Sequence, residues 1–185
     1  MLRSLGLDFE ICVTDADETV GNIDAKSTVY LLSRRKAECA AKLYPDCIVI
    51  AADTVVEAGG KILGKPKSRD DAKRMLRMLS GTHHTVYTGV TVENHGEYYT
   101  DVSSSDVYMH EIKDEEIDAY IKTGEPFDKA GSYGIQTLGG IFVDRIYGDY
   151  FNVTGMPKAM TARLLARAGV SICDILAQSA GCEES

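Results

Sequence analysis

The segment that most constrains the fold is residues 48–56, with the sequence IVIAADTVV. Eight of its nine residues are apolar or β-branched, which is typical of a strand buried on both faces of a sheet. Asp53 interrupts this run, and a buried carboxylate is costly unless a metal ion, a cation or hydrogen bonds offset its charge. Two interpretations stay open. Asp53 is either a structural residue at a strand bend or a metal- or water-holding carboxylate at a strand end, where ligands of α/β sheets bind.

The composition excludes several classes of partner. The chain has 185 residues, enough for a sizeable core, and its net charge of −8 argues against a nucleic-acid polymer or an anionic membrane. A small phosphorylated ligand stays compatible, because it needs only a local group of Lys and Arg. No apolar run approaches the roughly 20 residues that span a bilayer, and the first six residues lack the apolar core of a signal peptide. The five cysteines include no CxxC pair, so we expect reduced thiols in a cytoplasmic protein.

Helical and strand patterns alternate along the chain without repeats or long linkers. Residues 1–6 are typical of a helix end, and helices are predicted over 25–43, 69–81, 114–122 and 157–169. Strands are predicted over 7–13, 48–56, 61–63, 83–92, 97–109 and 140–146. Asp24, Ser68 and Asp114 are the expected helix caps. This mixture predicts an α/β or α+β domain with a substantial sheet.

Carboxylates and lysines recur in loops and near the ends of the predicted elements: Glu18, Asp53, Lys36, Lys65 and Lys129. Carboxylates hold Mg²⁺, the metal bridges phosphate oxygens, and lysines neutralise the remaining phosphate charge. A carboxylate also orients or deprotonates an attacking water. The chain has no P-loop, GxGxxG, GxSxG or HExxH motif, and its histidines lack metal-ligand spacing, which favours surface or strand positions for them. The residues alone therefore predict metal-dependent phosphate chemistry on a small anion.

One competing pattern lies near the N-terminus. Residues 9–13, followed by DADETV at 15–20, match the strand and DxDx[TV] motif of haloacid-dehalogenase-type phosphatases. In that interpretation Asp15 is a nucleophile that forms an aspartyl-phosphate. The motif is short, and Thr14 separates the Asp from a short apolar run. An aspartyl-phosphate phosphatase is therefore kept as an alternative.

Several short motifs together resemble the Maf family of nucleotide pyrophosphatases. They occur in the family's order over residues 1 to about 168, and as a set they are far more specific than any one of them. The matching stretches are DET at 17–19, RKA at 35–37, AADTVV at 51–56, GKP at 64–66, LSG at 79–81, VYTGV at 86–90, GEP at 124–126, KAG at 129–131, YGIQ at 133–136, NV at 152–153 and GMP at 155–157.

This resemblance implies a fold and a reaction. The implied fold is a single elongated α/β domain over 1–185, similar to the inosine triphosphatases, with a mixed sheet, flanking helices and two lobes around a cleft. The implied reaction is hydrolysis of a nucleoside triphosphate to the monophosphate and pyrophosphate with a divalent cation, Mg²⁺ or Mn²⁺. Family members are often homodimers, so a second copy of the chain is an expected partner.

The resemblance also implies roles for individual residues. Asp53 matches the proton acceptor, and Glu18 and Asp53 match the metal-holding carboxylates. Glu18, Lys36 and Lys65 match residues that line the triphosphate and metal site.

Two further residues match the family branch that acts on dTTP and UTP. They are Thr54 and Gln136, and a second branch, which prefers a methylated guanine nucleotide, carries a different residue set. The amide of Gln136 is suited to the carbonyl and N–H edge of a pyrimidine, with Thr54 shaping the neighbouring wall.

The chain departs from the family pattern at its start. The family opens with a strand and a Ser-x-Ser-Pro-Arg-Arg loop, and this sequence begins at the end of the helix that follows, so we expect an N-terminally shortened domain. Losing bidentate Arg contacts would weaken triphosphate binding. The alternative function is therefore a non-catalytic nucleotide-binding or cell-division regulatory protein.

Overall fold

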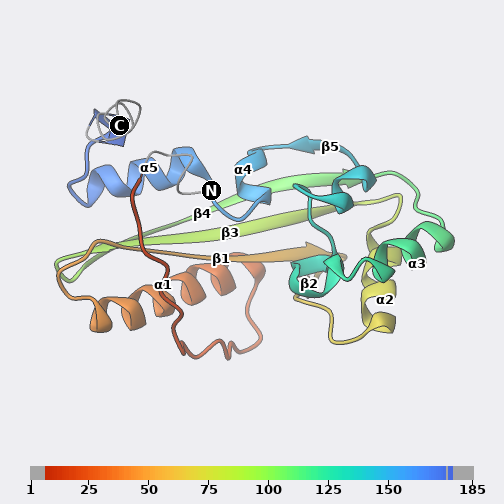
Figure 1. Cartoon of the computed structure of the whole chain (residues 1–185), viewed down its shortest axis with the longest axis horizontal. Helices are drawn as coiled ribbons and strands as arrows, with labels where there is room; N and C mark the ends of the chain where they lie inside the picture. The colour runs from red at the N-terminus through yellow and green to blue at the C-terminus, as the bar shows by residue number, and fades with distance from the viewer. Residues whose placement is uncertain (1–6, 174, 177–185) are drawn as a thin grey trace. The chain divides into compact units, whose positions relative to one another are not determined.

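A computed structural model describes residues 7–173, 175 and 176 of the chain (Figure 1). The helix end predicted at 1–6 and the last residues of the chain lie outside the described residues. The α-helices are α1 (Ala25–Leu43), α2 (Arg69–Leu79), α3 (Asp114–Lys122), α4 (Tyr150–Val153) and α5 (Lys158–Arg167). Short 3-10 helices are η2 (Glu125–Asp128), η3 (Ala130–Ser132) and η4 (Leu138–Phe142).

The strands form one sheet in the order β2-β1-β3-β4-β5. Their bounds are β1 (Val49–Ala58), β2 (Lys61–Leu63), β3 (His83–Asn94), β4 (Glu97–Met109) and β5 (Val143–Tyr147). β1 pairs antiparallel with β2, placing Val56 opposite Leu63, and β4 pairs antiparallel with β5, with a register shift between Tyr108 and Met109. The structure confirms an α/β fold with a sheet flanked by helices.

The chain folds into two compact units. Unit 1 contains residues 1–53, 89–102 and 156–185, and unit 2 contains residues 54–88 and 103–155. Strands β1, β3 and β4 each contribute residues to both units.

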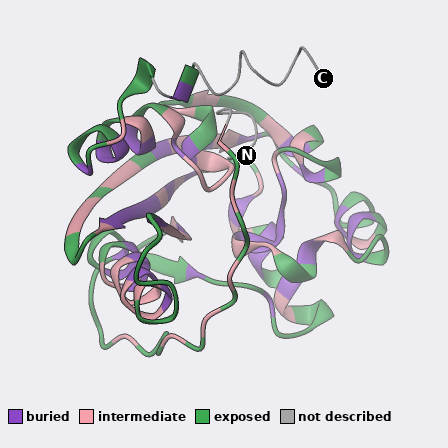
Figure 2. Cartoon of the chain, turned by 60° about the vertical axis from the view of Figure 1, so that its left-hand side comes forward, coloured by how far each residue is buried: buried purple, intermediate pink, exposed green. Residues whose placement is uncertain are grey.

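In unit 1, helices α1 and α5 cover opposite faces of β3. An added Cβ at Gly89 would lie 2.3 Å from the carbonyl oxygen of Val29, so α1 approaches the sheet closely at this glycine. Ser33 on α1 is also hydrogen-bonded to Thr91 of β3. The intervening strand residue Val90 packs instead with Leu164 of α5, as the alternation of side chains along a strand requires. Helix α1 accordingly has a buried side and an exposed side (Figure 2).

In unit 2, helices α2 and α3 pack on the sheet through an apolar core. Leu76 of α2 and Ile117 of α3 are fully buried against Val56, Val86 and Val107 from three strands. Burying side chains of this size contributes about 1.5–3 kcal/mol each. This core holds the unit 2 parts of β1 and β3, which carry Thr54 and Thr88.

Most predicted elements are confirmed, with three corrections. Residues 7–13 form no strand: Ile11 and Val13 are 85% and 89% exposed, so the apolar residues that suggested a strand are not buried. The last strand begins at Val143, because residues Leu138–Phe142 form η4. Helix α3 starts at Asp114 with Lys113 as its N-cap, and the carboxylate of Glu116 accepts the backbone N–H of Lys113.

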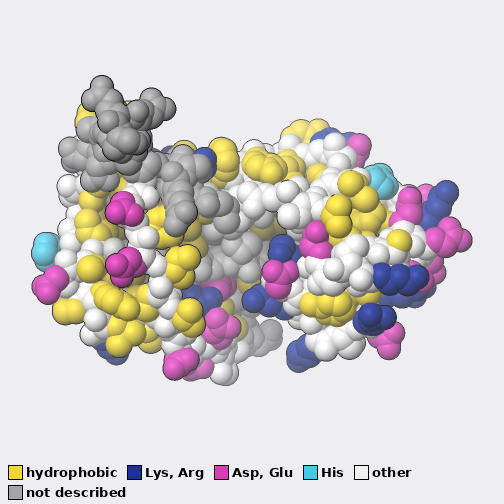
Figure 3. Space-filling view, viewed as in Figure 1, with side chains coloured by type: hydrophobic (Ala, Val, Ile, Leu, Met, Phe, Trp, Pro, Cys, Tyr) yellow, Lys and Arg dark blue, Asp and Glu magenta, His cyan; other side chains and the backbone are white. Residues whose placement is uncertain are grey.

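Other sequence expectations concern the surface and the cysteines. No helix in the described part of the chain is long and apolar enough to cross a membrane. Acidic and basic side chains are intermixed on the face shown in Figure 3. The four cysteines within the described residues are free thiols: Cys12, Cys39, Cys47 and Cys173.

Candidate functional site

In unit 1, one lysine joins two carboxylates from different segments. The Nζ of Lys36 lies 2.5 Å from Oδ1 of Asp53 and 3.0 Å from Oε1 of Glu18. Lys36 belongs to α1, which begins at Ala25 because the side chain of the N-cap residue Asp24 accepts the backbone N–H of Ser27 at 2.8 Å. We call Glu18, Lys36 and Asp53 the lysine–carboxylate cluster, and the structure thus brings together three residues predicted for the triphosphate and metal site.

Arg35 holds the loop that carries Glu18. Its Nη1 donates to the backbone oxygens of Asp17 and Thr19 at 3.0 and 2.7 Å, one on each side of Glu18. The Asp17 carboxylate in turn accepts the backbone N–H of Thr19 at 2.8 Å. In the sequence, Arg35 is recognisable only as part of a motif on a predicted helix. The available signal for its contact with the Glu18 loop was its position next to Lys36 in the sequence.

The lysine–carboxylate cluster keeps Lys36 charged. Burial of the ammonium opposes its charge, but the hydrogen bonds and negative charges of Asp53 and Glu18 outweigh this and raise the pKa of Lys36 above its ordinary value. The Asp53 side chain is only 12% exposed, so its charge is partly removed from solvent and the lysine offsets it.

The donor set of the cluster suits a hard divalent cation. Glu18 and Asp53 supply carboxylate oxygens, and both reach the same ammonium, so they converge on one positive charge. Mg²⁺ is usually bound by one or two carboxylates together with substrate phosphates and water. Within the described residues no group of three or more His, Cys, Asp or Glu side chains could hold a metal ion by itself.

In unit 2, the other three predicted residues line one pocket of about 390 Å³. Thr54 begins the unit 2 part of β1, Lys65 lies in the loop after β2, and Gln136 lies in the segment between η3 and η4. The side chains of Lys65 and Gln136 are exposed, and Lys65 lies close enough to Asp128 for an electrostatic interaction. Lys129 also lines this pocket and is paired with Asp128 at 2.7 Å.

Thr54 is held at the pocket by a chain of hydroxyl groups. Its Oγ1 lies 2.9 Å from Oγ1 of Thr88, and the Thr88 hydroxyl donates to the backbone oxygen of Asn152 at 2.9 Å. Because Thr88 has a single hydroxyl proton, Thr54 must be the donor of the first bond. The remaining capacity of the Thr54 hydroxyl is therefore that of an acceptor.

The loop that carries Lys65 contacts the loop that follows Lys129. The N–H of Gly131 donates to the backbone oxygen of Gly64 at 3.1 Å. Gly131 has φ of +70°, which favours glycine, and a Cβ there would lie 3.0 Å from Val56, a tight contact. This glycine therefore brings two lysine-bearing loops to the same pocket.

A buried histidine supports one wall of the pocket. Nε2 of His84 lies 2.8 Å from the hydroxyl of Tyr133, and His84 is 1% exposed. Burial lowers the pKa of His84 to about 4, with a smaller effect from His83 in the same direction and an opposite one from Asp106. His84 is therefore neutral at physiological pH. The sequence predicted only a surface or strand position for it.

The competing phosphatase interpretation gains no support. Asp15 is exposed, and the strand that should precede it is not formed.

Comparison with known proteins identifies the family of the chain. A family model described as "Maf-like protein" matches residues 1–168. The chain belongs to the Maf-like family. A Bacillus cereus relative named dTTP/UTP pyrophosphatase is 42% identical over 173 residues, covering 93% of this chain and 91% of the relative. Proteins of the same name from Bacillus pumilus and Halalkalibacterium halodurans are 42% and 41% identical over 172 residues, covering 92% of this chain and 91% and 90% of theirs.

Proposed function

We propose that this Maf-like chain is a nucleoside triphosphate pyrophosphatase that hydrolyses dTTP and UTP to the monophosphate and pyrophosphate. The lysine–carboxylate cluster carries the proposal, because it combines a carboxylate for water activation with oxygen ligands for a cation and a lysine for phosphate charge. The names of the relatives supply the substrate class. A dTTP- or UTP-specific enzyme also needs a pyrimidine site, and the pocket lined by Thr54 and Gln136 is our candidate for it.

In the proposed reaction, water attacks the α-phosphorus and pyrophosphate leaves. Asp53 orients this water and accepts its proton, which makes it the general base. Lys36, within the lysine–carboxylate cluster, offsets the negative charge that develops on the departing pyrophosphate. A divalent cation, Mg²⁺ or Mn²⁺, held through Glu18 and Asp53, would neutralise phosphate charge when bound.

In the pocket of unit 2, we assign base recognition to Gln136 and Thr54. An amide group offers one donor and one acceptor side by side, which matches the carbonyl and N–H edge of thymine or uracil. The Thr54 hydroxyl supplies a further acceptor. Free thiols within the described residues are compatible with the cytoplasm as the proposed location, and the family resemblance suggests a homodimer.

The testing experiment is a product analysis. The chain is incubated with dTTP, UTP, dCTP, dATP and GTP plus Mg²⁺, and pyrophosphate is separated from orthophosphate. We expect pyrophosphate from dTTP and UTP and its loss in Asp53→Asn. Asp46→Asn is the matched control, since Asp46 is exposed and makes no hydrogen bond to a described residue.

Each other outcome contradicts a specific part of the proposal. Full activity of a folded Asp53→Asn variant would remove Asp53 from the mechanism. Orthophosphate from simple monoesters, dependent on Asp15, would support the aspartyl-phosphate alternative. Thermal stabilisation by dTTP without turnover would show a nucleotide-binding protein that is not an enzyme.

A further inference from the structure

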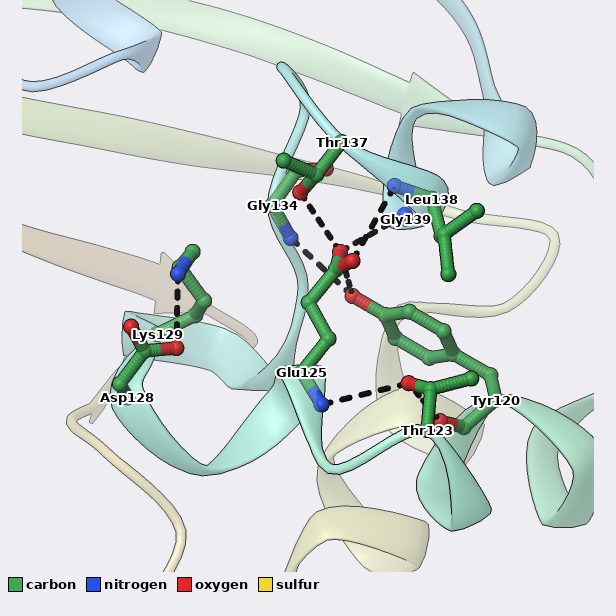
Figure 4. Close-up of polar contacts among 9 residues, drawn as sticks. All are labelled: Tyr120, Thr123, Glu125, Asp128, Lys129, Gly134, Thr137, Leu138 and Gly139. Atoms are coloured by element: carbon green, nitrogen blue, oxygen red, sulfur yellow. Dashed lines mark hydrogen bonds and ion pairs between the residues drawn. The ribbon is translucent and has the colours of Figure 1, made fainter.

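The carboxylate of Glu125 accepts hydrogen bonds from three sides (Figure 4). Its Oε1 accepts the hydroxyl protons of Tyr120 and Thr137 at 2.8 and 2.7 Å and the backbone N–H of Gly139 at 3.0 Å. Its Oε2 accepts the backbone N–H of Leu138 at 3.2 Å. These four hydrogen bonds hold the Glu125 side chain in one place at the start of η2.

The partners of Glu125 enclose the segment that presents Gln136 to the pocket. Thr137, directly after Gln136, is bonded to the carboxylate itself. Before Gln136, the N–H of Gly134 donates to the Tyr120 hydroxyl at 3.3 Å, and that hydroxyl donates to Glu125. The chain on both sides of Gln136 is thus connected to the Glu125 carboxylate by hydrogen bonds. Glu125 itself does not line the pocket.

The glycines around this carboxylate pack closely against the same group of side chains. A Cβ added at Gly139 would lie 2.5 Å from the Tyr120 hydroxyl. A Cβ at Gly134 would lie 2.6 Å from Oγ1 of Thr137. Contacts of this kind specify one arrangement of the backbone, because packed groups repack discretely and do not deform continuously.

The charge of Glu125 suits this role. Burial opposes its ionisation, but the hydrogen bonds from Thr137, Tyr120, Gly139 and Leu138 prevail and hold the pKa of the carboxyl below its ordinary value. Glu125 is therefore an ionised, acceptor-only group at neutral pH, and hydrogen bonds to a charged acceptor are stronger than neutral ones.

We propose that Glu125 is a positioning residue for base recognition, which fixes the segment from Gly134 to Gly139 so that the amide of Gln136 meets the pyrimidine. This inference rests on the proposed function, because it assigns Gln136 to the base. Glu125 touches neither substrate nor metal and acts through the loop alone. Its loss should weaken ground-state and transition-state binding of the base equally, and such a change raises KM and leaves kcat nearly unchanged.

The decisive experiment is a double-mutant cycle with Glu125→Ala and Gln136→Ala, measured as kcat and KM for dTTP. We expect Glu125→Ala to raise KM at least about tenfold with kcat within about threefold, as for loss of a uniform binding contact. In the Gln136→Ala background the same change should raise KM less than about twofold, because residues that act as a unit are not additive. Glu115→Ala, on the exposed side of α3, is the control. If the two changes raise KM independently, so that their factors multiply in the double variant, the inference is overturned.

Two milder variants keep the test decisive if Glu125→Ala fails to fold. Glu125→Gln retains an acceptor for Tyr120, Thr137 and Gly139 but faces the N–H of Leu138 with an amide donor. Thr137→Val removes one donor from an exposed side chain. Both should raise KM for dTTP without lowering kcat. When either is combined with Gln136→Ala, the KM of the Gln136→Ala protein should hardly change. A fall in kcat at constant KM would contradict the inference.

Amide hydrogen exchange separates this inference from the proposed function. We expect the N–H groups of Leu138 and Gly139 to exchange at least about tenfold faster in Glu125→Gln or Glu125→Ala than in the wild type, since local opening then costs less. Unchanged exchange would overturn the positioning role whatever the turnover. A wild-type chain that releases no pyrophosphate would instead overturn the proposed function.

Discussion

Lys36 donates a hydrogen bond to Asp53 across 2.5 Å and lies 3.0 Å from Glu18. Glu18 belongs to a loop, Asp53 to strand β1 and Lys36 to helix α1. The three elements therefore meet at the ammonium group of Lys36. The raised pKa of Lys36 means that the ammonium persists through neutral and moderately alkaline pH. Because the folded pKa is the higher one, its favourable contribution is present below about pH 10.5 and is lost as the pH rises through the folded pKa.

Lys36→Met should lower kcat/KM for UTP at least about 100-fold, the size typical of losing one electrostatic stabiliser. Lys36→Arg keeps the charge but not the compact ammonium, so we expect partial activity. Steady-state kinetics with the melting temperature as a folding control checks both. Lys26→Met, on an exposed residue of the same helix, is the matched control. Wild-type kinetics in the folded Lys36→Met protein would contradict the assignment.

Removal of divalent cations with EDTA should abolish pyrophosphate release, and added Mg²⁺ should restore it. Glu18→Gln removes the charge of one proposed ligand, so we expect at least about a tenfold higher Mg²⁺ concentration for half-maximal rate, in line with metal sites that lose a contact. Titration of the rate with Mg²⁺ at saturating dTTP measures this. An unchanged Mg²⁺ dependence in Glu18→Gln would exclude Glu18 as a ligand.

Thr88→Val tests the direction of the hydrogen bond from Thr54. The isosteric change removes the acceptor for the Thr54 proton and leaves the backbone oxygen of Asn152 without this donor, which costs about 1–3 kcal/mol of stability. The freed Thr54 hydroxyl can then donate as well as accept, so discrimination between dTTP and dCTP should decrease. The ratio of kcat/KM for the two nucleotides checks this, with Thr88→Ser as control. An unchanged ratio would remove the hydroxyl chain from base selection.

The starts of α1 and α2 were predictable because their signals are local. Asp24 accepts from Ser27 and Ser68 accepts from Asp71, both within one turn, so the sequence spacing itself specifies the contact. The strand expected at 7–13 failed because apolar residues form a strand only where a sheet buries them, and Ile11 and Val13 are exposed.

The residue types of the candidate site were predictable, but the hydrogen bonds that hold these residues in place were not. Lys36 and Asp53 were expected near each other on motif grounds. The role of Thr88 depends on Asn152, which is 64 residues away, and the role of Glu125 depends on backbone N–H groups at 138 and 139. Backbone donors leave no trace in a residue pattern, so such contacts become visible only in three dimensions.

Stability should fall with acid because of His84. This side chain is buried and neutral, with its pKa lowered to about 4 in the folded protein, while the unfolded chain titrates near 6.5. The unfolded state therefore binds more protons between these values, and the contribution lost as the pH falls from 6.5 to 4 is roughly 3 kcal/mol. Denaturant unfolding across this range, compared with His84→Gln, isolates the effect. A ring that titrates near 6.5 in the folded protein by NMR would contradict it.

Gly131→Ala should destabilise unit 2 more than a matched change at Gly60. Both glycines have positive φ, +70° and +72°, so both alanines carry a similar backbone cost of about 1 kcal/mol. A Cβ at Gly60 meets open space, whereas one at Gly131 lies 3.0 to 3.2 Å from Val56, a core residue of β1. We expect the additional overpacking at Gly131 to cost a further ~1–3 kcal/mol and to raise KM for dTTP, since the loops of Lys65 and Lys129 meet there. Equal losses in the free energy of unfolding for the two variants would show that the loops adjust without strain.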